Sequence, residues 1–386
     1  MRYFLSREAV LKWLEIPSVY HMKKDDLYEL DNDSIDFLRR SESEVGCESE
    51  ENEFVAYCLE EGILTKSRDL LKRPALIKSP EPSLRYLELQ ITDRCNLKCR
   101  HCYIGDSTDK PKKNKDELSV GRVRTVLKEF EAMQGLRVLI TGGEPLTHGN
   151  FGEINEMLPQ FFLRKVLFTN GLLLTKDILG KLNVHEIQIS IDGLEHSHDS
   201  LRGKGSFRSA IKAVNAALTA GFEVSVATMI HPENLVDFEE MDGLFREMGI
   251  KDWTVDVPCI TGRLEKNREF HITPEQGGKY LRYGYGSGLH SGASGFACGL
   301  HLAAVMADGR VSKCTFYADS FVGRIKDGLR TCWERIQPIR LDALACDCKY
   351  VEVCRGGCRY RALLSGDQFG KDLYKCSLYD IIDTKE

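Results

Sequence analysis

The sequence predicts an α/β protein: a partial (β/α)6 barrel with a small winged-helix-like N-terminal module and a cysteine-rich C-terminal domain. Three observations support this. Apolar strand-like runs alternate with amphipathic helical patterns over residues 84–260, short strands and then short helices fill residues 1–64, and closely spaced cysteines follow over residues 261–386. The alternation favours a parallel sheet, because parallel neighbours need a long connection that is usually a helix.

The composition is that of a globular protein and excludes fibrous and disordered classes. Of 386 residues, 42% are hydrophobic and 29% are charged. No apolar run approaches the roughly 18 residues that span a bilayer, and the first residues lack a secretory pattern. We therefore expect a cytoplasmic protein without a membrane partner. In a reducing compartment its 14 cysteines indicate metal ligation or catalysis more than disulfides.

The N-terminal module is predicted to contain three strands near Val10–Glu15, Ser18–Met22 and Leu27–Leu30, followed by helices that end near Gly62. Residues 1–62 carry 16 Asp and Glu against 7 Lys and Arg, a net charge of −9. So acidic a module is a poor partner for nucleic acid. Residues 65–83, which contain three prolines, are interpreted as a linker.

The barrel, residues 84–260, is predicted from six strand-like runs separated by helical patterns such as Val123, Val126, Leu127, Phe130 and Met133. The predicted strands are Arg85–Thr92, Arg137–Thr141, Lys165–Thr169, Glu186–Ile191, Glu223–Met229 and Trp253–Val257. In α/β barrels the chemistry lies at the C-terminal ends of the strands. The residues that follow each run are therefore the first candidates for a site.

Cys95, Cys99 and Cys102 stand directly after the first predicted strand. Three thiolates on one loop can ligate an iron-sulfur cluster and leave one iron open. A zinc site that recruits His101, or three buried core thiols, are the alternatives. The spacing favours the cluster.

The spacing CxxxCxΦC, with aromatic His101 before the last cysteine, resembles the signature of the radical S-adenosylmethionine (SAM) superfamily. After the second strand, the resemblance extends to the family's GGEP segment, which binds the SAM amino group, at Gly142, Gly143, Glu144 and Pro145. Glycines suit this role, because the backbone must approach a small ligand closely.

The resemblance implies further SAM contacts at the ends of later strands: Asn170, Ser190, Asp192, Arg202 and Met229. Ser190 and Asp192 are implied to contact the ribose hydroxyls, Arg202 the carboxylate, and Met229 the adenine. Two alternatives stay open. Arg202 can instead form a surface ion pair with Asp199, and Met229 can be a core residue.

The activity implied is reductive cleavage of SAM, which the open iron chelates, to methionine and a 5′-deoxyadenosyl radical. This radical abstracts a hydrogen atom from the substrate. The cofactors carry the difficult chemistry, and the protein positions them and excludes water.

The C-terminal cysteines resemble the SPASM extension of this superfamily, which holds two auxiliary 4Fe-4S clusters. The resemblance implies Cys298, Cys314 and Cys358 at the first cluster and Cys348, Cys354 and Cys376 at the second. The C-terminal domain is therefore predicted to be an iron-sulfur domain. A zinc ribbon is the alternative, for which the spacing is poor.

The sequence departs from the SPASM pattern at two positions. Where the family has a cysteine before the second group, this chain has Ala345, so that either Cys346 or Asp347 completes the second cluster. Where some relatives supply a fourth ligand to the first cluster, this chain has Gly292. The open alternatives are Cys332, Cys259 or an iron without a protein ligand.

The N-terminal module resembles the peptide-recognition element of ribosomal-peptide maturases, related to the chaperone of pyrroloquinoline quinone synthesis. A leader peptide would add a strand to an exposed sheet edge. Because the module is acidic, we expect a leader with Lys or Arg.

The expected function is thus hydrogen abstraction from a ribosomally made precursor peptide, followed by a thioether or carbon-carbon crosslink or another oxidation. An electron donor such as ferredoxin or flavodoxin is the second expected partner. Alternatives are a DNA-binding metal sensor, which the acidic module disfavours, an enzyme of tetrapyrrole side-chain decarboxylation, and a formylglycine-forming sulfatase maturase.

Overall fold

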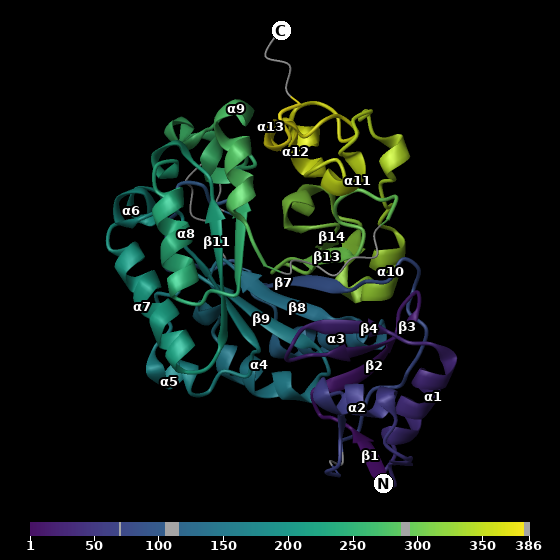
Figure 1. Ribbon diagram of the computed structural model, residues 1–386. Helices are drawn as coiled ribbons and strands as arrows, with labels where there is room; N and C mark the ends of the chain where they lie inside the picture. The colour runs from purple at the N-terminus through teal and green to yellow at the C-terminus, as the bar shows by residue number, and fades with distance from the viewer. Residues whose placement is uncertain (69–70, 105–115, 287–293, 382–386) are drawn as a thin grey trace.

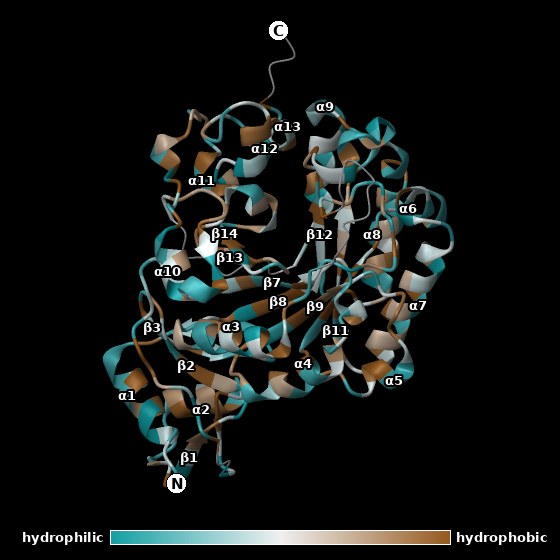
Figure 2. Ribbon diagram, turned by 180° about the vertical axis from the view of Figure 1, so that it is seen from behind, coloured by the Kyte–Doolittle hydropathy of each residue, from teal (hydrophilic) through white to brown (hydrophobic). Residues whose placement is uncertain are grey.

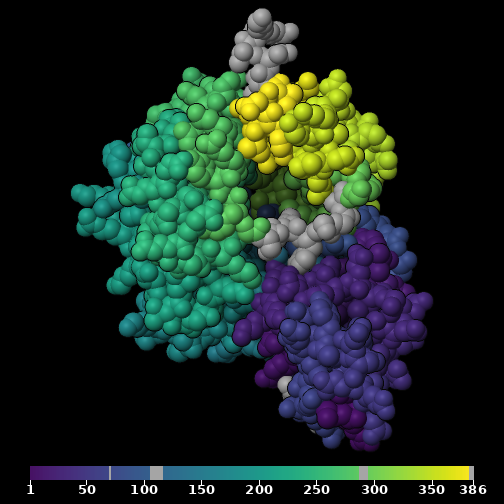
Figure 3. All heavy atoms as spheres, in the orientation of Figure 1, coloured from purple at the N-terminus to yellow at the C-terminus, as the bar shows by residue number. Residues whose placement is uncertain are grey.

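The computed structural model describes residues 1–68, 71–104, 116–286 and 294–381. It places the N-terminal module and the C-terminal region at opposite ends of a central sheet (Figure 1). In the space-filling view, the molecule is hollowed between the barrel, in green, and the C-terminal region, in yellow (Figure 3). No helix within the described ranges is both long and apolar enough to cross a membrane.

The N-terminal module contains the three predicted strands as the antiparallel sheet β2 (Ala9–Trp13), β3 (Pro17–His21) and β4 (Asp26–Glu29). Helices α1 (Asn32–Ser41) and α2 (Glu53–Glu60) follow, and each begins where Asp31 or Asn52 accepts a hydrogen bond from a backbone N–H group. The sequence analysis missed β1 (Arg2–Leu5), β5 (Cys47–Glu48) and β6 (Leu64–Thr65), which form a second small sheet. Such short strands leave too few residues for a period-two pattern.

Six parallel strands form the centre of the molecule, close to the predicted bounds: β7 (Tyr86–Thr92), β8 (Arg137–Gly142), β9 (Arg164–Thr169), β10 (Glu186–Ser190), β11 (Glu223–Met229) and β12 (Asp252–Asp256). They lie side by side in chain order, so that all their C-terminal ends meet at one edge. The predicted α/β class with a parallel sheet is confirmed.

The sheet continues into the C-terminal region, which the sequence analysis did not foresee. Strand β13 (Leu302–Val305) pairs in parallel with β7, and β14 (Arg310–Ser312) and β15 (Gly323–Arg324) extend the sheet in antiparallel fashion. The sheet therefore has nine strands, with β12 and β15 at its edges. Because β13 follows a long irregular segment, it lies outside the alternation of strands and helices by which the other parallel strands were predicted.

Helices cover the sheet, whose strands carry many hydrophobic residues (Figure 2). The apolar side chains between helices and sheet are buried. They are α3 (Val120–Ala132), α4 (Phe151–Met157), α5 (Lys176–Leu179), α6 (Glu195–Arg202), α7 (Ser206–Thr219) and α8 (Phe238–Glu247). The predicted stripe on α3, from Val123 to Met133, is buried against β7 and β8. The core thus fixes the strands whose ends carry the candidate site.

The C-terminal region is built from short helices: α9 (Pro274–Gly277), α10 (Leu329–Glu334), α11 (Val351–Cys354), α12 (Arg359–Leu364) and α13 (Leu373–Leu378). Beyond the sheet, its own apolar cluster is small and centres on Ala297, Leu341 and Leu344. So small a cluster offers little burial to hold the region together.

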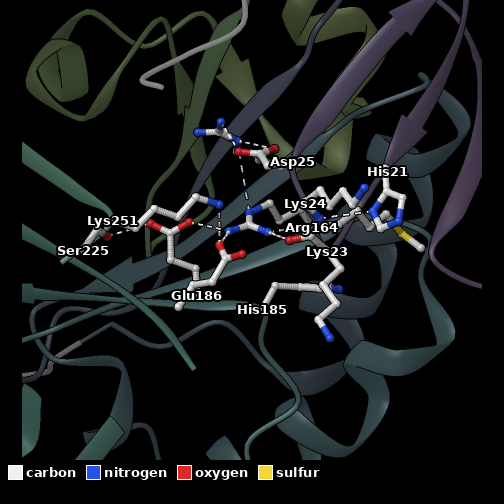
Figure 4. A network of polar contacts seen from close by, with 12 residues as sticks. His21, Lys23, Lys24, Asp25, Arg164, His185, Glu186, Ser225 and Lys251 are labelled. Atoms are coloured by element: carbon white, nitrogen blue, oxygen red, sulfur yellow. Dashed lines mark hydrogen bonds and ion pairs between the residues drawn. The ribbon is translucent and has the colours of Figure 1, made fainter. Parts of the chain in front are cut away.

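A buried polar network joins the N-terminal module to the N-terminal ends of the barrel strands (Figure 4). Arg164, whose side chain is fully buried, donates to the Met22 and Lys23 carbonyls and pairs with Glu186 at 2.7 Å, and also with Glu223. Asp25 of the module accepts from Arg137 at 2.9 Å. The module is therefore fixed at the end of the barrel opposite to the strand ends that carry the candidate site.

Candidate functional site

The cysteine loop begins where β7 ends, and the Gly142–Pro145 segment packs directly against it. The Gly143 N–H donates to the Thr92 carbonyl at 2.8 Å, and the Glu144 N–H donates to the Arg94 carbonyl at 2.7 Å. A Cβ atom on Gly142 would lie 2.3 Å from Thr92 O, and one on Gly143 would lie 2.2 Å from Arg94 O. The close approach of the two backbones therefore requires glycine at both positions. The sequence alone suggested a different reason, the close approach of a ligand.

Cys95, Cys99 and Cys102 lie on this loop close to one another. Burial raises the pKa of Cys99 to about 11 and also raises that of Cys95, and the neighbouring thiolates and Arg202 act on both. His101 lies elsewhere, with its Nε2 atom 4.0 Å from Asp192 Oδ2. Among the described residues, no group of three His, Cys, Asp or Glu side chains is arranged to hold a single metal ion. The choice between an iron-sulfur cluster and zinc at these thiols therefore stays a prediction.

Glu144 is a fully buried carboxylate between the ends of β8 and β9. It accepts hydrogen bonds from the Thr169 hydroxyl and the Asn170 N–H, both at 2.8 Å, and from the Leu146 N–H at 3.2 Å. Burial raises the pKa of Glu144 to about 7, although these hydrogen bonds oppose the shift. Pro145 is buried beside it and begins a 3-10 turn.

Asn170 links the end of β9 to the cysteine loop. Its Nδ2 atom donates to Asn96 Oδ1 at 2.8 Å and lies 4.0 Å from Cys95 Sγ. Ser190 is the last residue of β10 and is half-buried. Both therefore stand at the edge of the sheet where the cysteine loop begins.

Asp192 and Arg202 form a buried ion pair at the end of β10. Arg202 Nε donates to Asp192 Oδ2, and the Met229 N–H donates to Asp192 Oδ1 at 2.7 Å. Burial alone would raise the pKa of Asp192, but Arg202 and nearby histidines hold it well below its usual range. Asp199 instead accepts from the backbone of Gly205 and Phe207. The alternative of a surface pair between Arg202 and Asp199 is therefore wrong.

Met229, at the end of β11, lies partly in a core, and its contact with adenine stays a prediction. Its side chain is half-buried and packs against the cluster of Leu201, Leu264 and Phe270, while its backbone binds Asp192.

Three cysteines of the C-terminal region and Cys259, which follows β12, act on one another's pKa, and we call them the first thiol group: Cys259, Cys298, Cys314 and Cys358. Burial is the main cause that raises the pKa of Cys298, and Cys358 is the next. Burial also raises the pKa of Cys314, and Glu88 and Cys298 are the next causes. Cys358 raises the pKa of Cys259, and Cys259 in turn lowers the pKa of Cys358.

The second thiol group consists of Cys346, Cys348, Cys354 and Cys376. Burial and, secondarily, Cys354 and Cys348 raise the pKa of Cys346, despite the opposing charge of Arg359. Burial raises the pKa of Cys376 to about 11, and Cys346 is the next cause. Cys346 therefore lies among the other three, whereas Cys47, Cys58 and Cys332 belong to apolar cores.

A cavity of about 190 Å³ lies between the cysteine loop and the first thiol group. Its lining includes Tyr103, Thr315, Phe316 and Tyr360. Tyr103 directly follows Cys102 in the sequence, and Thr315 and Phe316 follow Cys314. The ring centroids of Tyr103 and Phe316 are 5.0 Å apart, and those of Phe316 and Tyr360 are 5.6 Å apart. Sequence reasoning missed this aromatic lining, although Tyr103, Phe316 and Tyr360 each follow a motif cysteine within two residues.

Comparison with protein families matches residues 89–245 to the Radical SAM superfamily. Among curated relatives, mycofactocin maturase MftC of Mycolicibacterium smegmatis is 28% identical over 319 residues, which cover 72% of this chain and 79% of the relative. The AdoMet-dependent heme synthase of Methanosarcina barkeri is 26% identical over 340 residues, which cover 75% of this chain and 95% of the relative.

Two solved structures share the fold. Streptococcus suis SuiB, in the structure with its precursor peptide SuiA, superposes with a TM-score of 0.68 at 14% identity and covers 97% of this chain and 100% of that chain. The enzyme anSMEcpe with bound AdoMet has a TM-score of 0.59 at 19% identity and covers 77% and 95%. At such identities the likeness establishes the fold alone.

Proposed function

We propose, from the premise that this chain is a radical SAM enzyme with its radical SAM domain at residues 89–245, that its substrate is a ribosomally made precursor peptide. The expected product carries a thioether or carbon-carbon crosslink, or another oxidation. The observation that carries the proposal is the combination of a thiol loop at the strand ends with a cavity beside it that the C-terminal region helps to line.

The residues of the strand-end site suit a 4Fe-4S cluster and SAM. Cys95, Cys99 and Cys102 offer three thiolates, which leaves one iron for SAM. Once bound, the pair supplies a 5′-deoxyadenosyl radical that can abstract a substrate hydrogen. The chain's own part is positional: Gly142–Pro145 support the thiol loop, and Asp192 holds Arg202 toward the cofactor. In this proposal, Asn170, Ser190 and Met229 border the same space.

The peptide assignment draws on the N-terminal module and on the relatives. Strand β4 is an edge of its sheet, and its exposed backbone can accept a further strand. Helix α2 borders this edge, since Tyr57 packs edge-on against Tyr28 with ring centroids 6.2 Å apart. A relative named as a maturase and a shared fold with a peptide-bound structure support the same assignment.

The heme-synthase relatives favour a second candidate, side-chain decarboxylation of a tetrapyrrole. The cavity beside the cysteine loop is lined by acidic residues, Asp93 and Asp308 among them, and by the rings of Tyr103, Phe316 and Tyr360. We favour the peptide because a maturase relative and the N-terminal module support it. Product analysis with each substrate decides between the two.

We propose that the two C-terminal thiol groups hold auxiliary 4Fe-4S clusters. Each group brings four thiols together, and thiolates are the standard ligands of such clusters. Cys346, and not Asp347, completes the second group. A ferredoxin or flavodoxin is the proposed electron donor.

The test uses the anaerobically reconstituted 386-residue protein with SAM, dithionite and any short Cys-rich or repetitive peptide that is found to be encoded near its gene. We expect release of 5′-deoxyadenosine and a peptide that has lost hydrogen, detected by mass spectrometry. The variant with Cys95, Cys99 and Cys102 all changed to Ala should form neither product while it keeps its other iron. Release of 5′-deoxyadenosine with a tetrapyrrole but never with peptide would overturn the peptide assignment.

A further inference from the structure

Cys259 lies in the chain segment that passes between the barrel and the C-terminal region. It follows β12 by three residues and its side chain is only 6% exposed. Cys358, which precedes α12, is the residue that most raises the pKa of Cys259, although the two are far apart in the sequence. Arg361 of α12 donates to Asp256 and to the Val257 carbonyl, just before Cys259, so that the two segments lie side by side. Cys259 is therefore buried beside a predicted cluster ligand, whereas a core cysteine is surrounded by apolar side chains.

A polar clamp holds these two cysteines together. Asp372 is almost fully buried. It accepts hydrogen bonds from the Cys358 N–H at 2.7 Å and from Arg361 Nη2 at 2.9 Å. Arg361 in turn donates to Asp256 at 2.9 Å and to the Val257 carbonyl at 3.2 Å. Because Asp256 and Val257 lead directly into Cys259, the clamp fixes the end of β12 against the start of α12. Charge-assisted hydrogen bonds of this kind orient metal ligands from behind.

The same segment also contacts the loop of the SAM site. The Arg263 N–H donates to the Cys102 carbonyl at 3.0 Å, and a Cβ atom on Gly262 would lie 2.5 Å from that oxygen. Residues 259–263 therefore connect the strand-end site to the first thiol group.

The other candidates for this position are absent from the first thiol group. Cys332 is fully buried in the barrel core, where its sulfur donates to the Arg324 carbonyl at 3.5 Å. The groups that act on its pKa are, after burial, Asp327, Arg335 and Glu129, and no cysteine is among them. Gly292 lies outside the described residues.

We propose that Cys259 is the fourth protein ligand of the first auxiliary cluster, beside Cys298, Cys314 and Cys358. The inference rests on the proposed function, because it assumes that this thiol group holds a cluster. All four irons are then bound by the chain, so that the cluster serves electron transfer and has no iron open to substrate. The substrate is held by the neighbouring aromatic cavity instead.

The test removes the SAM-site cluster first, by changing Cys95, Cys99 and Cys102 to Ala, so that only auxiliary clusters contribute to iron content and spectra. Cys259→Ala and Cys259→Ser are then added to this background, with Cys332→Ala as the matched control. Each anaerobically reconstituted protein is analysed for iron, and its dithionite-reduced EPR spectrum is recorded before and after addition of cyanide, which binds an open iron. Circular dichroism establishes that the variants are folded.

We expect the background protein and Cys332→Ala to have equal iron and spectra that cyanide does not change. Both Cys259 variants should either lose about four irons per chain, the content of one cluster, or acquire a cyanide-sensitive spectrum. The inference is overturned if the Cys259 variants match the background, or if the background already responds to cyanide. Since the proposed function is tested by product formation in the unmodified enzyme, it survives that result.

Discussion

Individual residues at the strand ends show how burial and charge shape this site. Glu144 and Asp192 are both buried carboxylates, yet their pKa values move in opposite directions. The hydrogen-bond donors to Glu144 are neutral, and the charge of Arg202 acts on it only weakly, so burial dominates and raises its pKa to about 7. At Asp192, burial is opposed by Arg202, by two histidines and by the Met229 N–H, which together lower the pKa. Asp192 is therefore ionised throughout the physiological range and keeps Arg202 in place.

Replacing Asp192 with Asn should cost about 3 kcal/mol or more of unfolding free energy, because Arg202 is left buried without its counter-charge. The measurement is the urea unfolding midpoint of the purified protein. Asp242→Asn is the matched control, since Asp242 forms an exposed pair with Arg246, and it should change stability by less than about 0.5 kcal/mol. Equal losses in the two variants would show that the buried pair is not special.

At the scale of elements, the ends of β7 and β8 act as a unit. The two strands pair along their whole length, and the register shifts only near Gln90 and Thr92, where the chain turns toward the cysteine loop. The Gly142–Pro145 segment then braces that loop through two backbone hydrogen bonds. Loop geometry thus depends on the absence of side chains at two positions.

Gly143→Ala tests this dependence. The new Cβ would collide with the Arg94 and Asp93 carbonyls, which cannot yield without moving the cysteine loop. We expect loss of the SAM-site cluster, about four irons per chain, with the remaining iron retained. Gly152→Ala in α4 is the control, because nothing lies within 4 Å of its Cβ position, and it should retain full iron. Iron analysis after anaerobic reconstitution decides between them, and a fully loaded Gly143→Ala protein would refute the argument.

At the scale of the whole molecule, polar contacts hold the three regions together. Arg164 connects the module to β9, β10 and β11 at one end of the sheet, and Arg361 connects α12 to β12 at the other. The linker is also fixed, since Arg73 donates to the Ser6 carbonyl at 2.7 Å. A leader bound at β4 would therefore start from a fixed point and reach the strand-end site along the barrel.

Arg164→Met should release the module from the barrel, because Asp25, Glu186 and Glu223 lose their shared buried cation. We expect a stability loss of about 3–5 kcal/mol and faster proteolysis within residues 65–83, followed by gel electrophoresis. Lys251→Met removes a partly exposed partner of Glu223 and should leave the digestion rate unchanged. An unaltered rate in Arg164→Met would contradict the docking role.

The sequence by itself determined the six barrel strands, the cysteine loop and the Gly142–Pro145 segment, because each is a local pattern: a run of apolar residues, a fixed spacing, a turn. Only the tertiary structure decided that Arg202 pairs with Asp192 and not Asp199, that β13 joins β7, and that Cys259 rather than Cys332 lies beside Cys358. The contacts of β13 and Cys259 join residues remote in the chain, and Arg202 reaches across a helix to Asp192. Burial and charge select them in three dimensions, and no spacing in one dimension encodes them.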